Sequence, residues 1–428
     1  MSKTKKYIVR ILFSMLPLLV GTGVLHAQVS KLLIPMDEAQ VDHLKAYGIA
    51  YWVLNKGYEV DWLLNYRGGS FMVEYADFIA AECRIRGVSF EGVSGAGAAV
   101  IYSEVQSETA NMDIVRMETA PKVAVYVPPN FQPWDDAVTM AMEYAEIPYD
   151  KIWDKEVMEG KLKNYDWLHL HHEDFTGQYG KFYATHRFEP WYLQQVAILE
   201  TTAQELGYKK VSQLKLDVAK TIKEYIAGGG FLFAMCSATD TYDVALAAQN
   251  TDICAEIFDG DPADPAMQSK LDFTQTLAFE NFKVEEDPFQ YEYSSIDVQP
   301  NIYSTAANDR FTLFDFSAKH DPVPTMLTQC HVGVVDGFLG QTTAFHKEFI
   351  KKNIIVLAER EGTDEVKYIT GNFGRGTFTF YAGHDPEDYQ HAIHDPPTDL
   401  ALHKNSPGYR LILNNILYPS ATKKKQKT

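Results

Sequence analysis

The stretch GGGFLFAMCSATDTYD, residues 228–243, decides the fold class. Its glycines end a helix-length segment at 215–227 whose apolar residues recur at helical spacing. A fully apolar strand follows at 231–235, Cys236 stands at the end of that strand, and a polar helix start comes next. A short apolar strand between two helices is typical of a parallel sheet that helices cover on both faces.

Strands and helices alternate on both sides of this stretch, so we predict an α/β fold with a doubly wound, mostly parallel, flavodoxin-like sheet. An N-terminal α/β unit at 28–120, also with parallel pairing, precedes the main domain at 121–420. The main domain contains an irregular insertion at about 259–349. The predicted strands are 31–36, 58–66, 88–93, 121–129, 165–174 and 231–235, and the predicted helices are 37–56, 73–86, 134–145, 215–227 and 409–417. Two further runs, 353–360 and 365–383, predict an antiparallel hairpin.

Residues 1–27 have the parts of a secretory signal peptide. Four basic residues precede an apolar run at 11–24, and the small residue Ala27 stands before the expected cut at Gln28. The apolar run is short for a membrane span, so we expect a secreted, periplasmic protein with no span after cleavage. An uncleaved anchor is the alternative. The lysine-rich residues 421–428 are expected to form a solvated basic tail.

The charge and the cysteines limit the partners. A formal net charge of -18 argues against nucleic acid and anionic membranes, since phosphate binding needs a basic surface. We therefore expect a small-molecule substrate or ligand, and the sequence leaves the oligomeric state open. The four cysteines are widely spaced without a CxxC motif, so they do not predict a disulfide scaffold.

Cys236 lies where a nucleophile elbow would present a catalytic side chain. Such an elbow needs small residues two positions away on either side, and Ala234 and Ala238 meet this requirement. A cysteine at a helix N-terminus is favoured as thiolate. The best candidate base is His384 at the end of a later strand, with Glu387 as the orienting acid. The alternative is that Cys236 is a buried or ligand-lining residue.

Three segments together resemble the class I glutamine amidotransferase-like superfamily, most closely its ThuA-like (trehalose-utilisation) branch. They are residues 228–243, GNFGRGTFTFYAGHDPE at 371–387, and GYRLILNNILYPS at 408–420. The resemblance covers about residues 121–420 apart from the insertion. The ThuA-like branch commonly has histidine where Cys236 stands. True amidotransferases have a glycine-flanked cysteine and His-x-Glu, where this chain has alanines and His384-x-x-Glu387.

The whole chain also resembles a group of secreted bacterial proteins known as asparagine synthetase B. That activity requires an N-terminal nucleophilic cysteine and an SGG-type loop for ATP, and the chain has neither. SGAGAA at 94–99 is no substitute. The resemblance therefore does not predict asparagine synthesis.

Histidines and carboxylates gather at two predicted strand ends. In HLHHED, His169 and His171 share one face of a strand, and His172 and Asp174 stand at its mouth. We predict that the substrate-binding residues are His171, His172, Asp174, Asp240 and Asp385. Zinc or another borderline metal is an alternative role for these histidines, but their spacing matches no metal motif, so no metal or other cofactor is assigned.

Two further motifs have simple interpretations. DGDPADPA at 259–266 is expected to be an acidic turn, with a calcium site as the alternative. YRGGSF at 66–71 is expected to be a plain turn between a strand and a helix, with an anion site as the alternative.

These observations predict a hydrolase that acts on an amide or a sugar-derived substrate in a crevice at the carboxyl ends of the strands. A protein of a different class is the alternative: a non-catalytic periplasmic ligand-binding or scaffold protein with a degenerate site. Contact between Cys236 and His384 would favour the first class, and a walled-off Cys236 would favour the second.

Overall fold

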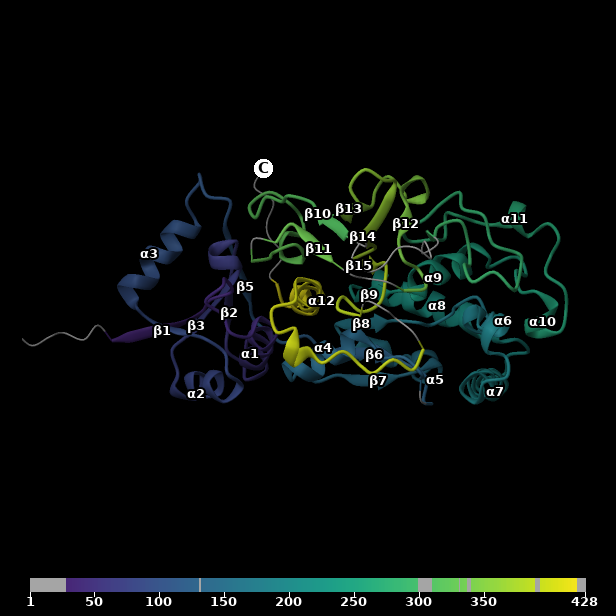
Figure 1. The fold of residues 1–428 in the computed structure, drawn as a ribbon, viewed down its shortest axis with the longest axis horizontal. Coiled ribbons are helices and arrows are strands. Elements are labelled where there is room, and N and C mark those ends of the chain that lie inside the picture. Colours follow the sequence, from purple (N-terminus) through teal and green to yellow (C-terminus); the bar gives the residue numbers. More distant parts are fainter. Residues whose placement is uncertain are drawn as a thin grey trace, which may run out of the picture.

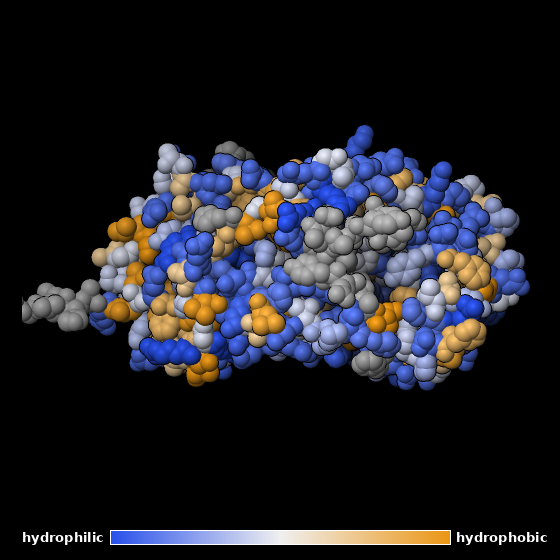
Figure 2. All heavy atoms as spheres, viewed as in Figure 1, coloured by the Kyte–Doolittle hydropathy of each residue, from blue (hydrophilic) through white to orange (hydrophobic). Residues whose placement is uncertain are grey.

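The structure is a computed structural model that describes residues 28–130, 132–298, 310–330, 332–336, 340–388 and 393–421. The predicted signal peptide and nearly all of the predicted basic tail lie outside the described residues. Sheet A with its helices forms one end of an elongated molecule, and sheet B forms the middle (Figure 1). Toward the other end lie the helices α6 (Tyr183–His186), α7 (Pro190–Glu205), α10 (Glu256–Asp259) and α11 (Met267–Lys270). On the face drawn in Figure 2, hydrophobic side chains are scattered among hydrophilic ones.

Sheet A has the strand order β4-β1-β3-β2-β5, and every neighbouring pair is antiparallel. Its strands are β1 (Val29–Ile34), β2 (Val60–Leu64), β3 (Ser70–Glu74), β4 (Glu91–Ser94) and β5 (Asp113–Met117). Its helices are α1 (His43–Asn55), α2 (Asp77–Arg86) and α3 (Gly95–Val105). The predicted parallel pairing in this unit is therefore wrong.

The error comes from the connection between β2 and β3. The motif YRGGSF does not lead into a helix, because it forms a tight turn in which Asn65, Arg67, Gly68 and Gly69 all have positive φ. So short a connection can join only antiparallel strands, whereas parallel strands need a crossover of about a dozen residues or more. β1 and β2, joined by α1, do run in the same direction, but β3 is inserted between them.

Sheet B is mixed, with the order β11-β10-β13-β14-β15-β9-β8-β6-β7 and β12 paired to β14. The strands β15, β9, β8, β6 and β7 are parallel, and the other pairings are antiparallel. The bounds are β6 (Val123–Tyr126), β7 (Asp150–Ile152), β8 (Trp167–Leu170), β9 (Phe231–Met235), β10 (Arg310–Leu313), β11 (Val334–Asp336), β12 (Phe345–His346), β13 (Ile355–Glu359), β14 (Glu365–Phe373) and β15 (Gly376–Tyr381). The molecule is thus mixed α/β.

Helices cover both faces of the parallel part of sheet B. Successive side chains of its strands point to opposite faces, so they pack in two different hydrophobic clusters. On β9, Phe231, Phe233 and Met235 join one cluster with α1, α4 and α12, whereas Leu232 and Ala234 join the other with α8 and α9. The remaining helices are α4 (Ala137–Ala145), α5 (Asp154–Met158), α6 (Tyr183–His186), α7 (Pro190–Glu205), α8 (Val211–Ala227), α9 (Ser237–Ala247), α10 (Glu256–Asp259), α11 (Met267–Lys270) and α12 (Pro407–Leu417). None of the described helices has the length and apolar character needed to cross a membrane.

One hydrophobic cluster joins the two sheets, since it contains Trp62 and Phe71 of sheet A together with α4 and α12. The buried Arg410 of α12 strengthens this connection, because its guanidinium donates to the Tyr47 hydroxyl at 3.0 Å and to the Met36 carbonyl at 3.2 Å. The strands of sheet A end at Met117 and those of sheet B begin at Val123, on either side of the predicted boundary.

The C-terminal part of sheet B brings His384 to the same edge as the end of β9. The predicted antiparallel pairing across residues 360–364 is confirmed for β13 and β14. The run 365–383 is not one strand, however, because it turns at Gly374, where a Cβ would lie 2.7 Å from the Ala227 Cα. The returning strand β15 then pairs in parallel with β9. The predicted insertion also adds β10, β11 and β12 to the antiparallel part of this sheet.

Candidate functional site

A cavity of about 590 Å³ lies at the carboxyl ends of β6, β7 and β8. Parallel α/β sheets place their ligands at this edge, because the loops that leave the strands open a crevice there. Aromatic rings, carboxylates, imidazoles and one buried lysine form the wall, and they include Trp134, Asp136, Trp153, His171, His172 and Lys215. The predicted residue Asp174 also lines this cavity, but Cys236 is not among the described residues that do.

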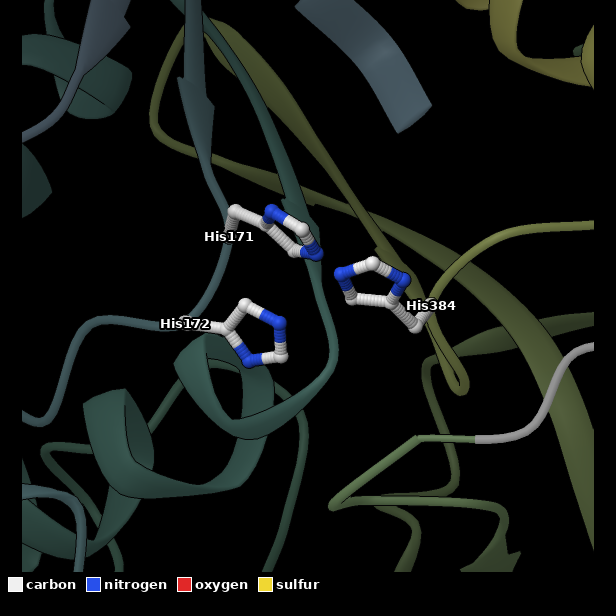
Figure 3. Close-up of side chains that lie close together, drawn as sticks. All are labelled: His171, His172 and His384. Atoms are coloured by element: carbon white, nitrogen blue, oxygen red, sulfur yellow. The ribbon is translucent and has the colours of Figure 1, made fainter. Parts of the chain in front are cut away.

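Three histidines from two strand ends meet beside this cavity. His171 and His172 directly follow β8, and His384 follows β15. Both strands are parallel neighbours of β9, so their carboxyl ends reach the same edge of the sheet. The ring centroids are 4.0 Å apart for His171 and His172, 4.3 Å for His171 and His384, and 4.6 Å for His172 and His384. Each ring directs a nitrogen toward the other two (Figure 3), and one nitrogen from each lies within 4.8 Å of the others.

Asp136 orients the neighbouring histidines. Burial alone would raise its pKa, but the charges and hydrogen bonds of His169 and His171 hold the pKa well below its ordinary value. The carboxylate lies 3.2 Å from His169 Nε2 and 3.6 Å from His171 Nδ1. It also caps α4 by accepting hydrogen bonds from the Val138 and Thr139 N–H groups. The position of His171 is thereby fixed relative to the helix start.

His169 connects Asp136 to the backbone of β9. Its Nδ1 lies 3.2 Å from the Phe233 carbonyl oxygen, and its Nε2 faces the Asp136 carboxylate. A carbonyl and a carboxylate both accept hydrogen bonds, so both ring nitrogens of His169 face acceptors. His169 and His171 lie on one strand face, as the two-residue period predicts, with ring centroids 5.8 Å apart.

Glu173 and Asp174 follow the histidines in the same loop and have different roles. Burial raises the pKa of Glu173 to about 7, and its Oε2 accepts the His171 backbone N–H at 2.7 Å. Asp174 accepts the backbone N–H groups of Thr176 at 2.7 Å and Gly180 at 3.0 Å. Asp174 therefore holds the loop in shape at the cavity wall.

Cys236 has the backbone of an elbow in a buried environment. Its φ of 52° and ψ of -139° form a sharp turn between β9 and α9, as the small neighbours Ala234 and Ala238 predict. The Sγ atom accepts the Gln341 N–H at 3.2 Å. Burial raises the pKa of this thiol to about 12, so the environment favours the protonated thiol over the predicted thiolate.

The other predicted site residues lie in separate contacts. Asp240 is buried in α9, where its Oδ1 accepts the Thr342 hydroxyl at 3.0 Å and burial raises its pKa to about 7. Asp385 is also buried, which raises its pKa, and it accepts the Glu387 N–H at 2.9 Å. The Glu387 carboxylate pairs with His403 at 3.1 Å. Asp240, Asp385 and Glu387 are not among the described residues that line the cavity.

The sequence interpretation missed several residues of the cavity wall, and Asp136 and Lys215 are two of them. Lys215 lies on the buried face of α8 and pairs with the buried Asp154 at 2.9 Å, while its ammonium stands 3.8 Å from the Trp153 ring centroid. Each residue carried a signal: Asp136 is a helix-capping residue after a strand, and Lys215 interrupts an apolar helix face.

The acidic turn at 259–266 is held by lysines. Lys210 lies 3.0 Å from the Asp259 carboxylate and 2.6 Å from that of Asp261, and Lys270 pairs with Asp264. The two lysine ammonium groups balance the negative charge of these carboxylates, which a bound calcium ion would do in the alternative interpretation.

No protein-family model and no curated protein matches this chain. Similar solved structures include two cytoplasmic proteins from Salmonella typhimurium, each with a TM-score of 0.33 and each matched over 100% of its own length. The first is 11% identical over 71% of this chain, and the second is 10% identical over 70% of this chain. Another is a β-galactosidase from Bacillus circulans sp. alkalophilus, with 13% identity over 68% of this chain and 32% of that one, at a TM-score of 0.26. Likeness at these TM-scores carries no argument about this chain.

Proposed function

We propose that the protein is an exported, class I glutamine amidotransferase-like protein of the ThuA-like branch, with a flavodoxin-like core. In this proposal it binds a small substrate in the cavity and hydrolyses an amide or sugar-derived bond there. The observation that carries the proposal is the 590 Å³ cavity at the carboxyl ends of β6, β7 and β8, with His171 and His172 in its wall. The parallel strands and the elbow at Cys236 are consistent with such a core.

The cavity wall favours a neutral substrate with many hydroxyl or amide groups. Carboxylates predominate there, and they would repel an anion. The charge of Lys215 is compensated by Asp154. Trp134 and Trp153 offer aromatic surface beside these hydrogen-bonding groups, a combination that suits a sugar ring. A sugar-derived substrate therefore fits the wall better than a phosphate or a carboxylic acid.

We assign the proton transfers of this reaction to the imidazoles of the cavity wall. A general base must lie within hydrogen-bond reach of the bound substrate, and His171 and His172 line the cavity. The Asp136 carboxylate positions His171 in the manner of an orienting acid. The predicted nucleophile Cys236 is buried, and its high pKa does not support a role as thiolate at neutral pH.

The second candidate is a non-catalytic ligand-binding protein. The specific observation in its favour is the complete burial of Cys236, which raises the pKa of its thiol to about 12 and disfavours the thiolate that an amidotransferase nucleophile needs. The cavity would then bind the same kind of ligand without changing it.

Calorimetry with neutral sugars and with glutamine and asparagine, combined with assays for ammonia and for new reducing ends, separates the two candidates. Turnover that His172→Ala abolishes, and that the control variant His346→Ala at a partly exposed position retains, supports hydrolysis. Binding without turnover selects the ligand-binding candidate. A cavity that binds none of these compounds at millimolar concentration contradicts both.

A further inference from the structure

We infer that His171, His172 and His384 together bind one divalent transition metal ion of the zinc type at the edge of the cavity. The inference rests on the convergence of three imidazoles from two strands that lie far apart in the sequence (Figure 3). It concerns metal binding itself, so its test requires no turnover. A histidine nitrogen that binds the ion cannot also accept a proton, so in the metal-loaded protein a metal-bound water would replace His171 and His172 as the general base proposed above.

The nitrogen positions require only a small adjustment to bind a metal. Three atoms no more than 4.8 Å apart lie within about 2.8 Å of a common centre, and zinc–nitrogen bonds are about 2.0–2.1 Å long, so inward shifts of about 0.7 Å complete the site. Rotations of the imidazole rings provide shifts of this size without a change in the backbone.

A cation explains why three imidazoles converge in a buried place. A neutral imidazole has one N–H donor and one lone pair. Three rings that face a common point therefore bring at least two lone pairs or at least two hydrogens together, and these like groups repel each other. Three imidazolium ions at ring separations of 4.0–4.6 Å would repel one another strongly. One metal ion, in contrast, binds three lone pairs at once.

The surroundings supply the support that metal-binding histidines usually have. Histidine ligands commonly donate their second ring nitrogen to a carboxylate, which fixes the orientation of the ring. The Asp136 carboxylate lies 3.6 Å from His171 Nδ1 and is itself held by the start of α4. His171 is therefore oriented by its carboxylate while its other nitrogen faces the cluster.

Two other clusters of possible ligands are engaged in different interactions. In the group Asp136, His169 and His171, both ring nitrogens of His169 already have hydrogen-bonding neighbours. In the group Asp252, Cys254 and Asp259, the Lys210 ammonium lies within 3.0 Å of both carboxylates and takes the place of a cation. The three-histidine cluster is thus the better site.

The ligand set indicates both the metal and its use. Three nitrogen ligands favour zinc, copper or nickel over magnesium or calcium, which prefer oxygen. Zinc sites with three protein ligands leave a position for water or substrate, whereas structural sites usually have four protein ligands. Since His171 and His172 line the cavity, a metal here would present that open position to the cavity.

The experiment measures metal binding by the purified, chelator-stripped protein at pH 7.5. Titration with Zn²⁺ against a competing chromophoric chelator is expected to give one tight equivalent, and Co²⁺ is expected to give the intense visible bands of a four- or five-coordinate site. His384→Ala and His172→Ala should each weaken binding by about a hundredfold or more. His346→Ala, which removes a histidine outside the cluster, should leave binding unchanged.

Asp136→Ser gives a graded check, because serine also caps a helix but lacks the carboxylate. We expect its zinc affinity to fall by about 10–100-fold, as for other supporting residues. Circular dichroism and the urea midpoint verify that each variant folds. Less than one fifth of an equivalent of Zn²⁺ bound by the unmodified protein at 10 µM free zinc would overturn the inference. Unchanged affinity in a folded His384→Ala protein would also overturn it.

Discussion

Cys236 should be nearly inert toward alkylating reagents in the folded protein. Its Sγ is fully buried, accepts the Gln341 N–H, and has a pKa raised by burial to about 12. At pH 7 a free thiol with a pKa of about 8.5 is roughly 3% thiolate, whereas a thiol with a pKa of about 12 is ionised to roughly one part in a hundred thousand. Ionisation alone therefore slows the reaction by about three thousandfold, and restricted access slows it further.

The assay is a time course of iodoacetamide labelling at pH 7, read by peptide mass spectrometry with glutathione as the free-thiol reference. Cys330 is the internal control, because it is only partly buried and should react much faster than Cys236. Labelling in 8 M urea should make all four cysteines react alike. Labelling of Cys236 at a rate within tenfold of that of glutathione, slowed again in His384→Ala, would contradict this expectation and support a catalytic thiolate.

Three further outcomes are expected. Lys215→Met should lower the free energy of unfolding by about 3–5 kcal/mol in urea titrations, because it leaves the buried Asp154 carboxylate without its positive partner. Adding Asp154→Leu should recover most of this loss, and equal stability of the single and double variants would contradict the prediction. Burial lowers the pKa of His43 to about 4 in the folded protein, below the 6.5 of the unfolded chain, so the unfolded chain binds the proton first and stability falls as the pH drops from about 6.5 to 4. Between pH 7 and 4.5 the loss is about 2 kcal/mol, and His43→Gln should lack this part of the pH dependence in urea midpoints. Finally, the intact mass of exported protein should correspond to a chain that begins at Gln28, and a mass that includes residues 1–27 would contradict the predicted signal peptide.

Local sequence patterns predicted several elements because those elements satisfy their own preferences. The strand at 231–235 coincides with β9, since an apolar run between a glycine-ended helix and a capping turn has few alternatives. The final helix was predicted at 409–417 and begins two residues earlier, at Pro407, behind its Ser406 cap. The 16-residue helix α7 was missed, because aromatic residues obscure its helical spacing.

Strand pairing is harder to predict from the sequence, because contacts between distant segments determine which strands pair. The helix α1 between β1 and β2 favoured a parallel pair, but the short turn after β2 placed β3 between them. Similarly, the turn at Gly374 divides one long apolar run into β14 and β15. A short turn within an apolar run changes the topology of the sheet without changing its hydrophobic pattern.

Sequence patterns alone predict that apolar strands alternate with amphipathic helices, that Cys236 lies in a strand-to-helix elbow, and that histidines stand at two strand ends. These features depend on local periodicity and small side chains, which can be read along the chain. The surroundings of those residues depend on how the chain folds. The tertiary structure buried the Cys236 thiol under residues about a hundred positions away, and it placed His384 against His171 and His172 through the parallel pairing of β8, β9 and β15. Burial and convergence set the charge state and ligand geometry of a site, and both arise from segments that meet only in the folded chain.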